Sequence, residues 1–164
     1  MEYIKTTAEI LAYKALNRNI DKTWVEWAVA MLMAGYETEN LVILAGEMEP
    51  YNQFELHKLT SLVLKELDLD LSDRETILKK YTCYLIEKAL NNETEHFDVL
   101  NTLKDLCIEL KYESYLYDFF SLYYAKDDLL ISKNQWYWEG ATQQNIDSII
   151  NEYFINYCTH DIVK

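Results

Sequence analysis

Glycine and proline are nearly absent from this sequence. Its 164 residues include three glycines and one proline, far below average usage, as is typical of a mostly helical chain. No two glycines lie close together, which excludes a glycine-rich phosphate-binding loop. The sequence also has no G-x-S-x-G, H-E-x-x-H or C-x-x-C motif, so it lacks these common nucleophile, zinc and redox signatures.

Cysteines and long apolar runs are scarce as well. Cys83, Cys107 and Cys158 are odd in number and far apart, which fits reduced, core-lining thiols better than a disulfide framework. No stretch approaches the roughly 18 uninterrupted apolar residues of a membrane span. Residues 1–10 are too acidic and polar for a signal peptide. We therefore expect a cytoplasmic protein that does not enter a membrane.

Positive charge is the third deficit. The chain has 15 Lys and Arg residues against 28 Asp and Glu residues, which gives a formal net charge of −13. Such a surface repels the phosphates of nucleic acids and of anionic lipids, and it attracts a basic protein partner. The alternative is that the acidic residues serve solubility alone.

Helical periodicity runs through most of the chain, and no segment alternates as a strand would. The sequence predicts an all-α fold: one domain over residues 1–164, a compact bundle of about eight helices in antiparallel hairpins, with a weak seam near residues 69–72. The expected helices cover approximately residues 7–16, 21–34, 38–45, 52–68, 72–90, 95–111, 114–125 and 142–160.

Short polar residues mark the expected helix starts. Asp21 is expected to accept a hydrogen bond from a free backbone N–H, and residues 6–9 and 72–75 have capping-box spacing. Gly35 is expected to end the second helix in the left-handed conformation. The other expected caps are Thr38 and Thr142.

Two further structural expectations concern the fourth helix and the long loop. The inward face of the fourth helix is expected to consist of Phe54, Leu59, Leu62, Val63 and Leu67. Residues 126–140 form the longest stretch without helical periodicity. They are expected to be a loop, with at most a short extended piece over 127–132.

No cluster of side chains in the sequence suggests metal or catalytic chemistry. His57, His96 and His160 lie on separate expected helices or their ends, without a second ligand at zinc spacing. Glu93 precedes His96 by three residues, but the second Glu-x-x-His motif of a di-iron helical protein is missing. We expect no metal, no cofactor and no catalytic residue.

Acidic residues are concentrated in two stretches without any Lys or Arg. Residues 23–57 contain six glutamates and no basic residue, and residues 134–163 again contain none. This segregation exceeds what solubility requires. Two interpretations stay open: an acidic recognition face and a plain solvated surface.

Aromatic residues are concentrated between Tyr112 and Trp138. Tyr and Trp anchor interfaces because they bury a large rigid area at low entropic cost. Tyr115, Phe119 and Trp136 are expected to pack against the final helix, whereas Trp138 is as well placed for surface recognition as for the core.

Size, acidity and aromatic usage together resemble the small acidic immunity proteins that bacteria make against their own secreted toxins, including those of contact-dependent inhibition systems. The resemblance implies a non-catalytic protein that binds a basic toxin domain and occludes its active site or substrate groove. The expected partner-binding residues are Glu37, Glu39, Glu47, Glu49, Tyr123, Tyr124, Asp127, Asp128, Trp136, Trp138 and Glu139.

Two alternatives stay open. The first is a helical interaction or adaptor domain, which forms a homodimer through the aromatic residues. The second is an enzyme with a polar pocket between the two halves of the chain.

Overall fold

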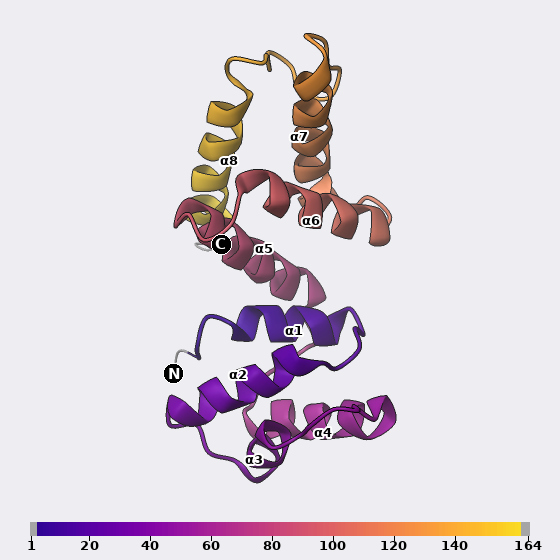
Figure 1. The fold of residues 1–164 in the computed structure, drawn as a ribbon, viewed down its shortest axis with the longest axis vertical. Coiled ribbons are helices and arrows are strands. Elements are labelled where there is room, and N and C mark those ends of the chain that lie inside the picture. Colours follow the sequence, from indigo (N-terminus) through magenta and orange to yellow (C-terminus); the bar gives the residue numbers. More distant parts are fainter. Residues whose placement is uncertain (1–2, 162–164) are drawn as a thin grey trace. The chain divides into compact units, whose positions relative to one another are not determined.

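The computed structural model describes residues 3–161, and these residues form eight α-helices and no strand (Figure 1). The all-α prediction is therefore confirmed. The helices are α1 (Thr7–Ala15), α2 (Lys22–Met33), α3 (Glu39–Ala45), α4 (Gln53–Glu66), α5 (Arg74–Leu90), α6 (His96–Glu109), α7 (Ser114–Ile131) and α8 (Ile146–Asp161).

The helices group into two compact units, which divide at the Tyr81–Thr82 bond within α5. The first unit holds α1 to α4 and the start of α5, and the second holds the rest of α5 with α6 to α8. Whether the chain behaves as one domain with a seam near 69–72 stays a prediction. Within residues 3–161, no helix is both long enough and apolar enough to span a bilayer.

The core of the first unit is built around the two tryptophans of α2. Trp24 and Trp27 are buried and meet edge to face, with ring centroids 6.0 Å apart. Trp27 Nε1 donates a hydrogen bond to Thr7 Oγ1 at 3.0 Å. The predicted capping box at residues 6–9 is therefore wrong: Thr6 makes no side-chain cap, and the Thr7 hydroxyl is a buried acceptor instead.

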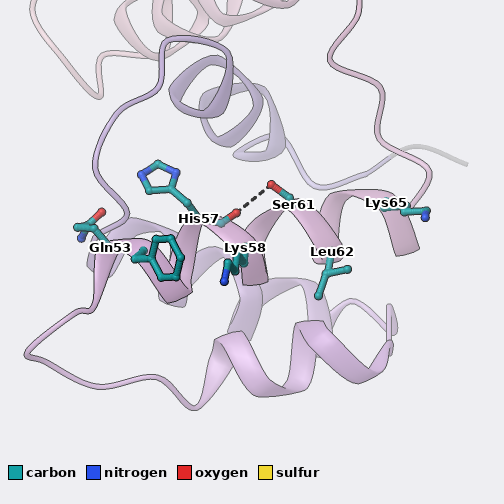
Figure 2. Close-up of a pocket in the computed structure, with 7 residues that line it drawn as sticks. Gln53, His57, Lys58, Ser61, Leu62 and Lys65 are labelled. Atoms are coloured by element: carbon teal, nitrogen blue, oxygen red, sulfur yellow. Dashed lines mark hydrogen bonds between the residues drawn. The ribbon is translucent and has the colours of Figure 1, made fainter.

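The inward face of α4 differs from the one predicted. Phe54 is 68% exposed and Leu62 is 49% exposed, so both were placed on the wrong face. The buried positions are Leu56, Thr60, Val63 and Leu64. The helix carries two apolar stripes, and packing against the other helices of the first unit decides which one enters the core. Lys58 and Leu62 project from the same side of α4 (Figure 2), and both are exposed.

Phe119 of α7 lies at the centre of the second unit. Its side chain is fully buried, and its ring meets Tyr153 and Tyr157 of α8 at centroid distances of 5.4 and 5.0 Å. The prediction that Phe119 packs against the final helix is confirmed. Figure 1 shows α7 and α8 side by side, joined at one end by a long loop.

Helix α7 continues beyond its predicted end near Ala125. It runs to Ile131, so the short extended piece predicted over 127–132 is wrong. Leu122, Ala125 and Leu129 are buried at helical spacing. The apolar stripe of the helix therefore continues past Asp127 and Asp128, although aspartate is a weak helix former.

The helix caps follow the prediction in part. Asp21 Oδ1 accepts a hydrogen bond from Thr23 N at 2.9 Å, as expected. The Thr38 hydroxyl does not cap α3. Helix α8 begins at Ile146 rather than Thr142, because residues 142–145 form a turn in which Asn145 Oδ1 accepts from Thr142 N.

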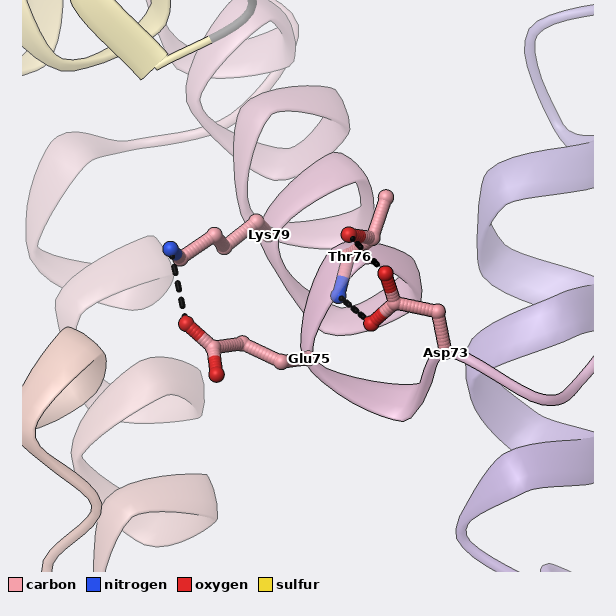
Figure 3. Close-up of polar contacts among 4 residues, drawn as sticks. All are labelled: Asp73, Glu75, Thr76 and Lys79. Atoms are coloured by element: carbon pink, nitrogen blue, oxygen red, sulfur yellow. Dashed lines mark hydrogen bonds and ion pairs between the residues drawn. The ribbon is translucent and has the colours of Figure 1, made fainter. Parts of the chain in front are cut away.

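Helix α5 is capped by Asp73 rather than by Ser72. Asp73 Oδ1 accepts from Thr76 N at 3.0 Å and Oδ2 accepts from the Thr76 hydroxyl at 2.7 Å (Figure 3). One turn on, Lys79 and Glu75 form an i,i+4 ion pair at 2.8 Å. Ser72 instead donates its hydroxyl to Asp70.

The Asp73 cap predicts a pH dependence of stability. Hydrogen bonds from Thr76 hold the pKa of Asp73 below its ordinary value. Its contribution to stability is therefore present above the ordinary pKa and is lost as the pH falls through the lowered one. We expect wild type to exceed Asp73→Asn in melting temperature at neutral pH, and the difference to vanish in strong acid. A difference that persists unchanged in acid would contradict this account.

Gly35 supplies a second prediction. Its φ is +93°, Gly35 N donates to Leu32 O, and Tyr36 N donates to Met31 O, which is the Schellman end of a helix. Gly35→Ala is expected to lower the free energy of unfolding by about 1 kcal/mol through backbone strain alone, because the added Cβ meets no atom within 4 Å.

Gly46→Ala is the matched control in urea unfolding. Gly46 follows α3 with φ −92°, and an added Cβ would make only ordinary contacts there. We expect a change within about 0.5 kcal/mol. Equal losses for the two variants would contradict the assignment of strain to Gly35.

Candidate partner-binding surfaces

The first unit has an open groove of about 620 Å³ beside α2 and the loop that joins α3 to α4. We name it the acidic groove. It is lined by Lys22, Val25, Glu26, Val29, Glu47, Met48, Glu49 and Tyr51.

Three glutamates give the acidic groove its charge. Glu26 pairs with Lys22 at 3.2 Å, and both side chains are largely exposed. Glu47 and Glu49 take part in no ion pair with any residue in the described part of the chain. Two carboxylates are therefore left to attract a cation from outside.

Local sequence places these two glutamates on either side of an apolar side chain. Helix α3 ends at Ala45 and α4 begins at Gln53, so residues 46–52 form a surface loop. Met48 is 79% exposed between Glu47 and Glu49. Lys and Arg have apolar stems and charged heads, and a surface that combines apolar and carboxylate groups suits them.

Glu37 and Glu39 lie elsewhere in the first unit. Both are exposed beside the start of α3, and neither lines the acidic groove. Glu39 occupies the first turn of α3, where a carboxylate stabilises the positive end of the helix dipole. The structure thus brings Glu47 and Glu49 into one groove and gives Glu39 a local structural role.

The second candidate surface is the loop between α7 and α8, residues 132–145. Gln135 Nε2 donates to Trp138 O at 2.6 Å and to Ala141 O at 3.2 Å, and its Oε1 accepts from the backbone N of Tyr137 and of Trp138, both at 2.8 Å. Gln143 Nε2 donates to Leu129 O and Ser132 O. Asn145 Nδ2 donates to Gly140 O. Side-chain amides therefore order this loop, which we name the amide-braced loop.

The amide-braced loop presents Trp136 to solvent. The Trp136 side chain is 91% exposed, so the prediction that it packs against the final helix is wrong. Trp138 takes the inward place, edge-on to Tyr153 with ring centroids 5.7 Å apart. Leu130 and Ile131, at the adjoining end of α7, are also exposed. An ordered, exposed tryptophan beside aliphatic side chains is typical of an interface anchor.

Tyr123 and Tyr124 are half-buried and held by other rings. Tyr123 stacks on Phe97 at 4.8 Å between centroids, with Lys104 Nζ 4.6 Å from its own centroid. Tyr124 stacks on Tyr137 at 5.4 Å. These contacts explain why both tyrosines are half-buried. Their predicted role in binding a partner stays a prediction and depends on the parts of the rings that are exposed.

Three predicted carboxylates lie on α7 or the amide-braced loop. Asp127 and Glu139 are exposed, and Asp128 is half-buried. None of the three forms an ion pair with a side chain of residues 3–159, the side chains that the structure describes. Lys126 pairs with Asp147 across the two helices instead.

Buried titratable groups have structural roles. Burial lowers the pKa of Lys14, whose Nζ donates to His57 O at 2.9 Å and Thr60 Oγ1 at 2.8 Å and so ties α1 to α4. Burial raises the pKa of the Cys107 thiol, which disfavours a reactive thiolate. No group of three or more His, Cys, Asp and Glu side chains in the described residues could hold a metal ion.

Comparison with known proteins assigns no relationship. No protein-family model matches the chain, and neither a curated protein nor a solved structure matches it.

Sequence reasoning missed the bracing amides. Five of the twelve residues from 134 to 145 are Asn or Gln, a density that signals side-chain hydrogen bonding to a loop backbone. Read with the absence of helical periodicity, this composition predicts an ordered loop rather than a mobile one. The exposure of Trp136 has no such local signal.

Gln135→Ala tests the bracing. We expect a loss of roughly 1–3 kcal/mol in the free energy of unfolding, because two loop carbonyls and two loop N–H groups lose their partner. The amides of Tyr137 and Trp138 should also exchange faster with solvent deuterium. Gln144→Ala, at an exposed neighbouring amide, is the control and should leave both measurements unchanged. Unaltered exchange at Tyr137 and Trp138 in Gln135→Ala would show that the loop is ordered by other contacts.

Proposed function

We propose that this protein is a non-catalytic cytoplasmic inhibitor that neutralises a basic cognate toxin by occluding its active site or substrate groove, as bacterial immunity proteins do. The observation that carries the proposal is the acidic groove, where Glu47 and Glu49 flank the exposed Met48 and lack ion-pair partners in the described chain. The cognate toxin must present a basic surface to this groove.

Long-range attraction forms the first step of binding. A net charge of −13 raises the encounter rate with a basic domain and discourages acidic competitors. Docking follows at the acidic groove, where a lysine or arginine of the toxin lays its stem along Val25, Val29 and Met48. Its charged head then meets the carboxylates of Glu47 and Glu49.

A second anchor comes from the amide-braced loop. Trp136 is ordered before binding, so its burial in a toxin pocket loses little conformational entropy. Asp127 and Glu139 add negative charge on the same unit. The acidic surface raises the association rate and orients the partner, while burial of the Trp136 ring slows dissociation.

The exposed end of α7 favours a second candidate function, an adaptor domain. Leu130, Ile131 and Trp136 are apolar and exposed, and a partner that used them alone need not be basic. Salt separates the two functions, because an apolar contact is insensitive to ionic strength whereas acidic steering weakens as salt rises.

Charge reversal in the acidic groove tests the proposed function. We expect Glu47→Lys/Glu49→Lys to slow association with the basic toxin domain encoded beside this gene by about tenfold or more. Growth protection in cells that produce the toxin should fall with it. Association rates are measured by stopped flow across a salt series.

Glu93→Lys/Glu152→Lys is the matched control, since both residues are exposed and lie outside the candidate surfaces. It changes the net charge by the same amount and should retain most of the rate. If both variants slowed association equally, the effect would come from the net charge of the protein rather than from the acidic groove. If the neighbouring gene encodes no basic toxin, the proposal that the partner is a cognate toxin is contradicted.

A further inference from the structure

Helix α4 carries a second open groove, of about 760 Å³, whose charge is opposite to that of the rest of the surface. We name it the basic groove. Figure 2 shows its lining residues, which all come from α4: Gln53, Phe54, His57, Lys58, Ser61, Leu62 and Lys65. No carboxylate lines it, although Asp and Glu outnumber Lys and Arg by 28 to 15 in the chain.

The basic groove combines an apolar surface with two ammonium groups. Phe54 and Leu62 are exposed and lie eight residues apart, which is about 12 Å along a helix. Lys58 stands between them, with its Nζ 3.9 Å from the centroid of the Phe54 ring. Lys65 follows Leu62 by almost one turn. A complementary occupant needs an apolar side chain that packs on Leu62 and a carboxylate for each of the two lysines beside it.

The two lysines have unused charge. Neither Lys58 nor Lys65 forms an ion pair with a carboxylate among the side chains described, those of residues 3–159. By contrast, Lys79 and Lys22 each pair with a glutamate four residues away. A partner can therefore pair with both ammonium groups of the basic groove without breaking an existing ion pair.

The chain itself carries the complementary shape and charge. In the loop after α3, Met48 is exposed between Glu47 and Glu49, and these glutamates also lack ion-pair partners in the described residues. An apolar side chain between two carboxylates matches Leu62, which lies between Lys58 and Lys65 along α4. Because Met48 is 79% exposed, its own chain's groove does not take it up.

We propose that a second copy of this protein occupies the basic groove. Met48 of one copy packs on Leu62 of the other, and Glu47 and Glu49 pair with Lys58 and Lys65 on either side of it. The flexible stems of the lysines let their ammonium groups adjust to the spacing of the carboxylates. This self-association does not rest on the proposed function.

Self-association would compete with a basic partner for Glu47 and Glu49, so the free protein would shield the carboxylates that the partner needs. The net charge of −13 on each copy opposes the contact at long range. At physiological ionic strength this repulsion is screened beyond about 8 Å, while the pairs formed in contact persist. The association is therefore weak and depends on concentration.

Sedimentation equilibrium of the full chain tests the proposal. Wild type should gain mass as concentration rises towards the millimolar range. Lys58→Glu/Lys65→Glu and Glu47→Lys/Glu49→Lys should each stay monomeric, with association at least about tenfold weaker, because each places like charges opposite each other. Met48→Ser should weaken association without any change of charge.

An equimolar mixture of the two reversed variants is the decisive sample. One variant has two acidic surfaces and the other has two basic ones, so the mixture restores opposite charges across the contact and should regain mass. Arg74→Glu/Lys133→Glu, two exposed basic residues outside the groove, is the matched control and should behave as wild type.

Three results would overturn the proposal: a monomeric wild type at every concentration, association that survives either reversal, or a mixture that stays monomeric. Circular dichroism confirms that each variant is folded. The proposed function is judged separately, because Lys58→Glu/Lys65→Glu leaves the acidic groove intact and should still bind the basic toxin domain. Loss of self-association with retained toxin binding therefore separates the two proposals.

Discussion

Ionised carboxylates must stay in water, and most of this structure follows from that constraint. No Asp or Glu side chain that the structure describes is buried. Among residues 3–159, the polar residues that are buried carry hydroxyls: Thr7, Thr60, Thr82 and Ser121. The interior is thus left to apolar and aromatic groups, and all recognition by charge takes place on helix exteriors and loops.

Lys and Arg are few in this chain, so a lysine without an ion pair points to a site where a partner can bind. Where a lysine lies beside a glutamate on the same helix, as Lys79 does beside Glu75, both charges are satisfied locally. The acidic and basic grooves are two places where charges of opposite sign stay without ion pairs around exposed apolar side chains. The unpaired charges of each groove lie within a short span of sequence, one around Met48 and one along α4, so a few substitutions can create or remove them.

Local rules predict much of the fold and less of the surface. Asp21 and Gly35 act as expected because a cap depends on the few residues around it. Phe54 and Leu62 were misplaced because α4 has two apolar stripes, and packing against the other helices of the first unit selects between them. Trp136 was misplaced for a similar reason, since Trp138 fills the inward site two residues later. Periodicity predicts that a face is apolar, but not which face is covered.

The loop that displays Trp136 is held by neutral groups. Gln135, Gln143 and Asn145 do not titrate, and amide hydrogen bonds between uncharged partners respond little to dissolved ions. Its shape is consequently the same in dilute and in concentrated electrolyte, and across the range of acidity found in cells. The molecule thus combines two kinds of surface. The strength of its acidic surface varies with salt, whereas the conformation of the loop that carries Trp136 does not.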